Sequence, residues 1–229
     1  MDALIRPLAR AAGQLGERAF LGVLVRSLAW SAGCFVALHF LALWCVRQVL
    51  GGHVMLGWAA GILAAFGASV LALWLFLPLA AAIGTLYIDR VAAAVERRWY
   101  PSLPQAHGAS LPVQIWDGIN LGSRVLLLNI LALISALILP GIGLLLAWAI
   151  AAYAIGRGLF VAVAMRRLSR PAAELLYHRV RGIVLAHGAI LALAAYVPVL
   201  NLLIPVLGTA VMVHDLDIAL TQAPPGVSP

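Results

Sequence analysis

Residues 125–155 read VLLLNILALISALIL-PG-IGLLLAWAIAAYAI, and this stretch decides the fold class. Two apolar arms of 15 and 14 residues flank Pro140-Gly141, and neither arm contains a charged side chain. A proline beside a glycine interrupts a helix and favours a turn. Each arm, if helical, is about 22 Å long, shorter than the hydrocarbon core of about 30 Å. The pattern predicts a hairpin of short helices that enters the membrane and returns. Full-length crossing by residues 142–165 is the alternative.

The composition of the whole chain places it in a membrane. Of its 229 residues, 64% are hydrophobic and 10% are charged, with a mean hydropathy of +1.05. A soluble domain averages about 45–50% apolar and about 25% charged residues. We therefore expect an all-α integral membrane protein and exclude nucleic-acid binding, a disulfide scaffold and a disordered chain.

Cys34 and Cys45 lie in one apolar run, about 16 Å apart along a helix, so they cannot bond to each other within it.

Two long transmembrane helices are expected before this hairpin. The first span covers residues 28–46 and ends at Arg47. After a tight turn at residues 51–53, residues 54–88 carry no charge over 35 positions, or about 52 Å as a helix. Because that length exceeds the bilayer, we predict a bend near Pro78.

A second short hairpin is expected near the C-terminus. It has a polar start at residues 171–181, an apolar arm at 182–197, a breaker at Pro198 and a second arm at 202–213. A half-penetrating hairpin is tolerated where protein or water covers the backbone at its tip.

These segments form a single membrane domain over residues 1–229. An interfacial amphipathic segment is favoured at the N-terminus because arginines alternate there with Leu and Ala, and because the first apolar core is too long for a secretory signal. We predict this segment at 1–26, a long helical hairpin at 27–100, a loop at 101–112, short hairpins at 113–168 and 169–220, and a disordered tail at 221–229.

The arginines indicate the orientation of the chain. All fifteen basic residues are arginine; Arg47 alone lies in the turn between the first two spans, whereas eight arginines precede the first span or follow the second. Positive residues accumulate on the cytoplasmic side, so we expect a multi-pass protein of the bacterial inner membrane with both termini cytoplasmic. The eight are Arg6, Arg10, Arg18, Arg26, Arg90, Arg97, Arg98 and Arg124.

Small residues follow one face of the second span. They recur every four positions, which lets helices approach closely in lipid. An intramolecular helix contact and an oligomer interface are equally compatible with this row, which consists of Gly57, Gly61, Ala65 and Ser69.

The sequence contains no enzyme motif, and we expect neither catalysis nor a cofactor. It lacks a zinc-protease signature, a phosphate-binding loop, a redox Cys-x-x-Cys and a serine nucleophile elbow. Asp89 and Glu96 lie two turns apart on one helix face. They could share a site; the alternatives are that they are solvated or pair with Arg90, Arg97 or Arg98.

Histidines and acids at membrane depth are candidates for function. His39 and His187 lie within apolar spans, and a neutral histidine hydrogen-bonded between helices is the alternative for each. His214, Asp215 and Asp217 lack a fourth metal ligand nearby. We expect an interfacial helix end there and no metal site.

Arg157 is the sharpest candidate. A charged arginine near the bilayer centre costs about 2.5–3.5 kcal/mol and needs a partner, a water path or an anion. The flanking Gly156 and Gly158 would let another backbone or a ligand approach, and snorkelling to the interface is the alternative. Asn129 and Asn201 are the other polar groups at depth, where each could hydrogen-bond a helix tip.

Three segments resemble the CysZ sulfate-permease family and its etoposide-induced eukaryotic relatives. Residues 198–212 (PVLNLLIPVLGTAVM) carry the most specific likeness. The others are residues 76–78 (FLP) with 89–92 (DRVA) and 95–96 (VE), and residues 156–160 (GRGLF) with 163–167 (VAMRR). Within these segments the structural motif residues are Pro78, Asp89, Glu96, Pro198, Asn201, Pro205 and Gly208.

The resemblance implies an inner-membrane permease or channel for sulfate that assembles as a homo-oligomer. The family carries a Gly-Leu-Arg-type segment before its first long helix; the matching stretch here is residues 18–22 (RAFLG), followed by Arg26 and Ser27. A helix start with an adjacent arginine suits a dianion. The family's Gly-Arg-Glu-type segment lacks its acid here, which would leave Arg157 freer to meet an anion. The anion-binding candidates are Arg18, Gly22, Arg26, Ser27 and Arg157.

Two functions are expected, the first implied by the family resemblance and the second by the arginine-rich composition. The first is a permease or channel for sulfate or a related oxyanion that supports sulfur assimilation, with no nucleotide site of its own. The alternative is a non-transporting membrane-organising protein that binds anionic lipids through its arginine-rich cytoplasmic face.

Overall fold

The computed structural model describes residues 2–14, 16, 18–50, 66–67, 69, 88–103 and 106–222. The chain divides into two compact units, Met1–Leu21 with Tyr87–Pro229 and Gly22–Leu86. Within the described ranges the elements are helices. They are α1 (Asp2–Gly13), α2 (Arg18–Leu50), α4 (Ile88–Trp99), α5 (Leu111–Ile138), α6 (Pro140–Ala164), α7 (Arg170–Ala194) and α8 (Pro198–Thr221).

Three helices are long and apolar enough to cross a membrane. They lie in α5 (Pro112–Ile138), α6 (Gly141–Ala164) and α8 (Leu203–Thr221). Their length and composition match the thickness of a bilayer. The expectation of an all-helical membrane protein is confirmed for the part of the chain that the structure describes.

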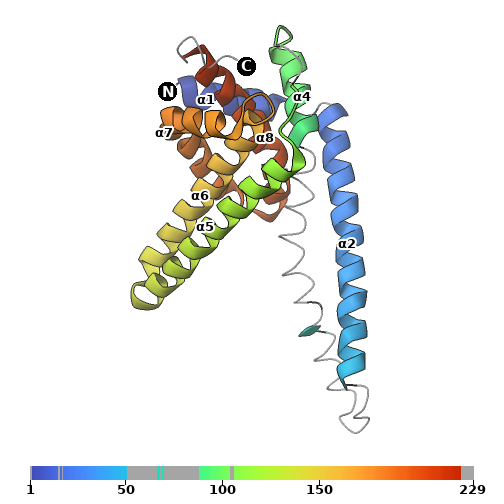
Figure 1. Cartoon of the computed structure of the whole chain (residues 1–229). Coiled ribbons are helices and arrows are strands. Elements are labelled where there is room, and N and C mark those ends of the chain that lie inside the picture. The colour runs from blue at the N-terminus through green and yellow to red at the C-terminus, as the bar shows by residue number, and fades with distance from the viewer. Residues whose placement is uncertain are drawn as a thin grey trace. The chain divides into compact units, whose positions relative to one another are not determined.

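The α5–α6 hairpin is longer than the sequence analysis predicted. The two helices have 28 and 25 residues, or about 42 Å and 38 Å, so the expected arm length of about 22 Å was wrong. The polar residues 111–124 and the Gly-Arg-Gly segment continue the helices, because a polar side chain does not end a helix and Pro112 lies at its permitted N-terminal position. Figure 1 shows α5 and α6 side by side, extending away from α1, α7 and α8.

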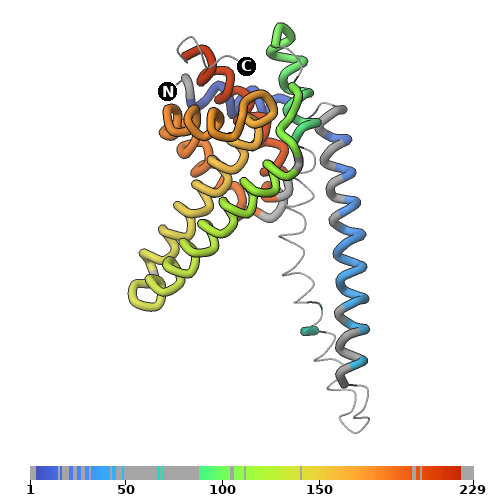
Figure 2. Tube along the Cα trace, in the orientation of Figure 1, coloured from blue at the N-terminus to red at the C-terminus, as the bar shows by residue number. Residues whose placement is uncertain are grey.

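The turn between α7 and α8 falls at Ala195–Val197, directly before Pro198. The polar start and the apolar arm predicted for the second short hairpin are one helix, α7, of 25 residues. The final helix also continues beyond its predicted end at Val213 and contains Pro205 in its interior. Figure 2 traces the return of the chain from α6 through α7 into α8.

Helix α6 is the centre of this unit and packs against α5, α7 and α8. It approaches α7 closely at Gly156 and Gly188: a Cβ atom on Gly156 would lie 2.8 Å from the Val184 carbonyl oxygen, and a Cβ atom on Gly188 would overlap the carbonyl of Ala152. Only glycine permits this backbone approach. The buried core side chains include Phe160, Val161, Val163, Leu176, Val184, Leu191, Val211 and Met212.

The N-terminal region forms two helices. α1 covers twelve residues and packs against α8 and α7, while α2 begins at Arg18, earlier than the start expected at Ser27. α2 includes the whole predicted span 28–46 and presents Trp30 and Phe40 as exposed side chains.

Some predictions lie outside the described residues. These are the second long helix at 54–88 with its bend at Pro78, the small residues Gly57, Gly61 and Ala65, and the tail from residue 223.

Candidate functional site

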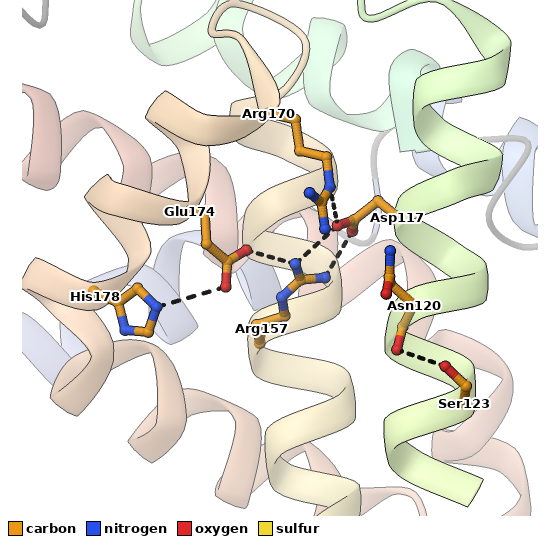
Figure 3. A network of polar contacts seen from close by, with 7 residues as sticks. All are labelled: Asp117, Asn120, Ser123, Arg157, Arg170, Glu174 and His178. Atoms are coloured by element: carbon orange, nitrogen blue, oxygen red, sulfur yellow. Dashed lines mark hydrogen bonds and ion pairs between the residues drawn. The ribbon is translucent and has the colours of Figure 1, made fainter.

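Arg157 lies at the centre of a buried ion-pair network between α5, α6 and α7 (Figure 3). Its Nη1 donates to Asp117 Oδ2 at 2.6 Å, and its Nη2 donates to Asp117 Oδ1 at 2.8 Å. Nη2 also donates to Glu174 Oε2 at 2.5 Å. From the start of α7, Arg170 Nε donates to Asp117 Oδ1 at 2.9 Å. The fork-shaped pairing with Asp117 is the strong, geometrically specific form of an arginine–carboxylate contact.

The side chains of the network differ in their exposure to solvent. The Arg157 and Asp117 side chains are 3% and 6% exposed, whereas those of Glu174 and Arg170 are 26% and 30% exposed. Two arginines and two carboxylates leave no net charge, which makes their burial tolerable. The Nε of Arg157 is buried without a hydrogen-bond partner. Arg157 therefore retains one unused donor, and its partner Glu174 lies toward the surface.

The absence of an acid from the Gly-Arg-Gly segment was expected to leave Arg157 freer to meet an anion, but the structure gives Arg157 two acidic partners. The acid missing from its own segment is replaced by Asp117, forty residues earlier, and Glu174, seventeen residues later. A charged guanidinium at this depth requires compensation, and the helix packing supplies it from two other helices.

A second ion-pair cluster joins α4 to the end of α6. Arg166 Nε donates to Asp89 Oδ1 at 2.9 Å, and its Nη1 donates to Glu96 Oε1 at 2.5 Å. Arg167 contacts the same Glu96 carboxylate at 3.0 Å. Asp89 and Glu96 were expected to share a site or to pair with arginines of their own helix; the structure shows one arginine that follows α6, Arg166, contacting both.

A cavity of about 460 Å³ lies between the two clusters. It is formed by the loop before α5 and the segment that joins α6 to α7, and it is lined by Arg170 of the first cluster and by Arg166 and Arg167 of the second. The Gly108 amide donates to the Arg166 carbonyl at 2.9 Å, which fastens the loop to this segment. Arg170 lines the cavity and also binds Asp117, so it connects the cavity to the buried network. The lining includes His107, Ser110, Arg166, Arg167, Ser169 and Arg170.

The other anion-binding candidates lie on α2. Arg18 is the first residue of this helix, and Gly22, Arg26 and Ser27 follow within its first ten residues. The first N–H groups of a helix have no partner within it, so the local chemistry there suits an anion. Arg26 is exposed. Arg18 and Gly22 fall on opposite sides of the boundary between the two units.

The motif residues of α8 start the helix, hydrogen-bond within it and allow it to pack against α6. Pro198 begins the helix and Asn201 donates its backbone N–H to the Val197 carbonyl at 2.8 Å, in the first turn. Thr209 donates its hydroxyl to the carbonyl of Pro205. A Cβ atom on Gly208 would overlap Leu159 of α6, so this glycine allows α6 and α8 to pack.

His187 is hydrogen-bonded between helices. Its Nδ1 lies 2.7 Å from Asp215 Oδ2 of α8, and its Nε2 lies 2.9 Å from the Leu4 carbonyl of α1. His39 instead packs against Phe35 and Phe40 of its own helix.

The polar residues near the end of α8 have separate partners. His214 Nδ1 lies 2.7 Å from the hydroxyl of Tyr100, and Asp217 forms a hydrogen bond with the same tyrosine. Among the described residues no group of three His, Cys, Asp or Glu side chains is arranged to hold a metal ion. Asn129 donates to the Val125 carbonyl within α5, so it does not reach the hairpin tip.

Sequence reasoning missed Asp117, Glu174 and Arg170. The available signal was scarcity, because the chain has only eight acids in 229 residues. Asp117 and Glu174 each lie in the polar first part of a hairpin. An acid retained there in such an apolar chain indicates a buried cation nearby.

Comparison with protein families shows which family the chain belongs to. The family described as "Sulfate transporter CysZ/Etoposide-induced protein 2.4" matches residues 8–205. The chain belongs to this family. No curated protein and no solved structure matches it. The resemblance read from the three sequence segments is therefore confirmed, and the apolar helices together with the family establish a membrane protein. The family description names a transporter, which accords with the expectation of a protein that is not an enzyme.

Proposed function

We propose that this protein conducts sulfate or a related oxyanion across the bacterial inner membrane and supports sulfur assimilation. The observation that carries the proposal is the buried Arg157 network and its connection, through Arg170, to an arginine-lined cavity. Family membership supports the same class of solute. Arginine is suited to this task because its planar fork binds oxyanions at two atoms and keeps its charge when buried.

The cavity of about 460 Å³ is the proposed entrance for the anion. At a share of about 30 Å³ per water molecule, it has room for about fifteen waters, or for a hydrated oxyanion. Arg166, Arg167 and Arg170 line it, so an anion would meet positive side chains before it reaches the apolar helices.

Carboxylate exchange is the proposed means of passage. Glu174 holds Arg157 Nη2 but is partly exposed, whereas Asp117 is almost fully buried. An arriving oxyanion would displace Glu174 and take over its hydrogen bond. In the resting network Arg157 keeps its charge balanced by the two carboxylates until the exchange occurs.

Uptake of radiolabelled sulfate into proteoliposomes tests this function. We expect saturable uptake by vesicles that contain the purified protein, reduced by molybdate competition and absent from empty vesicles. Uptake equal to that of empty vesicles, for sulfate and for phosphate and molybdate alike, would reject the transport function and favour the lipid-binding alternative.

We also propose that the tip of the α5–α6 hairpin stays within the lipid. The tip residues Leu137 and Ile138 are 80% and 74% exposed, yet they are wholly apolar, which is unfavourable in water. The backbone of the turn is largely satisfied, because Leu139 N–H donates to Ser135 and the Leu139 carbonyl accepts from Ile142 and Gly143. Pro140 contributes no N–H group. These features reduce the cost of a helix break in hydrocarbon.

Cysteine accessibility distinguishes this arrangement from a full crossing. In a protein whose native cysteines are replaced by alanine, Leu139→Cys is expected to resist a membrane-impermeant maleimide from both sides. Ser102→Cys in the exposed loop after α4 is the labelled control. Labelling of residue 139 from the outer side would show that the hairpin crosses.

We propose that both termini are cytoplasmic and that the protein assembles as a homo-oligomer. The distribution of arginines supports cytoplasmic termini. The apolar side chains along α5 are almost entirely exposed, so lipid or a second copy of the chain must cover them. A homo-oligomer would supply part of that cover.

A further inference from the structure

A second cavity, of about 350 Å³, lies where α1, the end of α4 and the end of α8 meet. It is separate from the Arg157 network, since α5, α6 and α7 contribute none of its lining. Arg6 and Arg10 line it from α1, one helical turn apart and hence on one face. Tyr100, His214 and Asp217 form the facing wall.

The hydrogen bonds of Tyr100 organise this wall. Its hydroxyl interacts with Arg10, Asp217 and His214. Burial, and then the negative charge of Asp217, raise the pKa of Tyr100 to about 12, so the phenol keeps its proton at neutral pH. A phenol has one proton to donate and two lone pairs. Donation to the Asp217 carboxylate leaves the oxygen to accept from Arg10 and from His214 Nδ1–H, which assigns the histidine tautomer.

The charge and shape of the cavity select a monoanion with oxygen acceptors. Two guanidiniums face one carboxylate, so the lining has one net positive charge when His214 is neutral. Arg10 is held over the Trp99 ring, with Cζ 4.5 Å from the ring centroid, which fixes the orientation of its fork. A phosphodiester carries one negative charge and accepts hydrogen bonds from arginine at two oxygens.

The surroundings place this cavity at the level of lipid headgroups. Asp217 lies four residues before the end of α8, a helix long enough to span a bilayer. Trp99 and Tyr100 have the amphipathic rings that gather at membrane surfaces. Ile5, beside Arg6, is 56% exposed and offers an apolar contact for an acyl chain.

We propose that the cavity formed by Arg6, Arg10, Tyr100 and Asp217 binds the phosphodiester headgroup of an anionic membrane lipid. The bound lipid fastens α1 against α4 and α8 at the membrane surface. This site is independent of the proposed anion path, and its test does not involve transport.

Native mass spectrometry of the purified full-length protein, titrated with phosphatidylglycerol, tests the proposal. We expect one molecule to bind more tightly than phosphatidylcholine does. The double variant Arg6→Gln/Arg10→Gln should weaken binding by about tenfold or more, because charge-assisted hydrogen bonds are lost. The matched control Arg97→Gln/Arg124→Gln removes two exposed arginines outside the cavity and should bind as the wild type does.

A folded variant keeps the proposal testable if the double variant is unstable. Arg10→Lys retains the charge but loses the planar fork, and a several-fold weaker affinity is expected. An equal loss of phosphatidylglycerol binding in the control variant would show that general surface charge causes the effect, and would overturn the proposal. Displacement of the lipid by inorganic phosphate at equal concentration would also overturn it, because the site would then be one for a free anion.

Discussion

Arg157→Gln is expected to lower sulfate uptake into proteoliposomes by about tenfold or more. The substitution removes charge-assisted hydrogen bonds to the anion, each worth about 1.5–3 kcal/mol, and 1.4 kcal/mol corresponds to tenfold. It also takes the arginine partner from Glu174 and leaves Asp117 with Arg170 alone, so its folding must be verified by size-exclusion chromatography and circular dichroism.

Glu174→Gln separates an anion contact from a structural role. If an oxyanion displaces Glu174 from Arg157, removal of this carboxylate should lower the KM for sulfate by about tenfold or more, since close like charges near a protein surface repel by about 4 kcal/mol and 1.4 kcal/mol corresponds to tenfold. Arg124→Gln, an exposed position on α5, is the control and should leave uptake unchanged. Unchanged KM in Glu174→Gln, together with lost uptake in a folded Arg157→Gln protein, would assign Arg157 to structure alone.

The second large effect concerns the anchoring of α1. His187 and Asp215 are fully buried, and both nitrogens of His187 face acceptors, the Asp215 carboxylate and the Leu4 carbonyl. His187→Ala removes the partner of a buried carboxylate, whose second oxygen already lacks a hydrogen bond. Breaking a buried pair in this way costs about 3–5 kcal/mol. In a chain of this size, that corresponds to a decrease in Tm of about 10 °C.

Thermal unfolding in detergent, followed by tryptophan fluorescence, measures this loss. His178→Ala is the matched control on the same helix, because His178 is 60% exposed and lies 3.7 Å from Glu174; exposed pairs contribute at most about 1 kcal/mol. The loss of the Leu4 contact should also expose α1 to trypsin at Arg10. Equal Tm values for the two histidine variants would contradict a role of the buried pair in holding α1.

The exchange of Glu174 for an anion and the anchoring of α1 rely on different physical features. The first depends on a carboxylate that is exposed enough to move, and the second on a pair that is excluded from water. A weakened α1 that leaves sulfate uptake intact would show that the two parts of the protein act separately.

The sequence by itself determined the class of structure and the positions of the helix breaks. An apolar content of 64% with few charges has one stable environment, the bilayer. Pro140 and Pro198 end or begin helices through local chemistry, and the structure has its breaks at these residues. The helix lengths were underestimated because the continuous apolar run is interrupted in residues 111–124, where polar and apolar side chains mix, although the backbone stays helical there.

Only the tertiary structure decided the partners of the buried charges. Arg157 has glycines as sequence neighbours. Its acidic partners are Asp117 of α5, forty residues earlier, and Glu174 of α7, seventeen residues later, and helix packing brings them together. Asp215 likewise meets His187 and, through it, Leu4 across most of the chain. Local propensity cannot specify such contacts, because burial against other helices alone makes an unpaired charge too costly and thereby selects its partner.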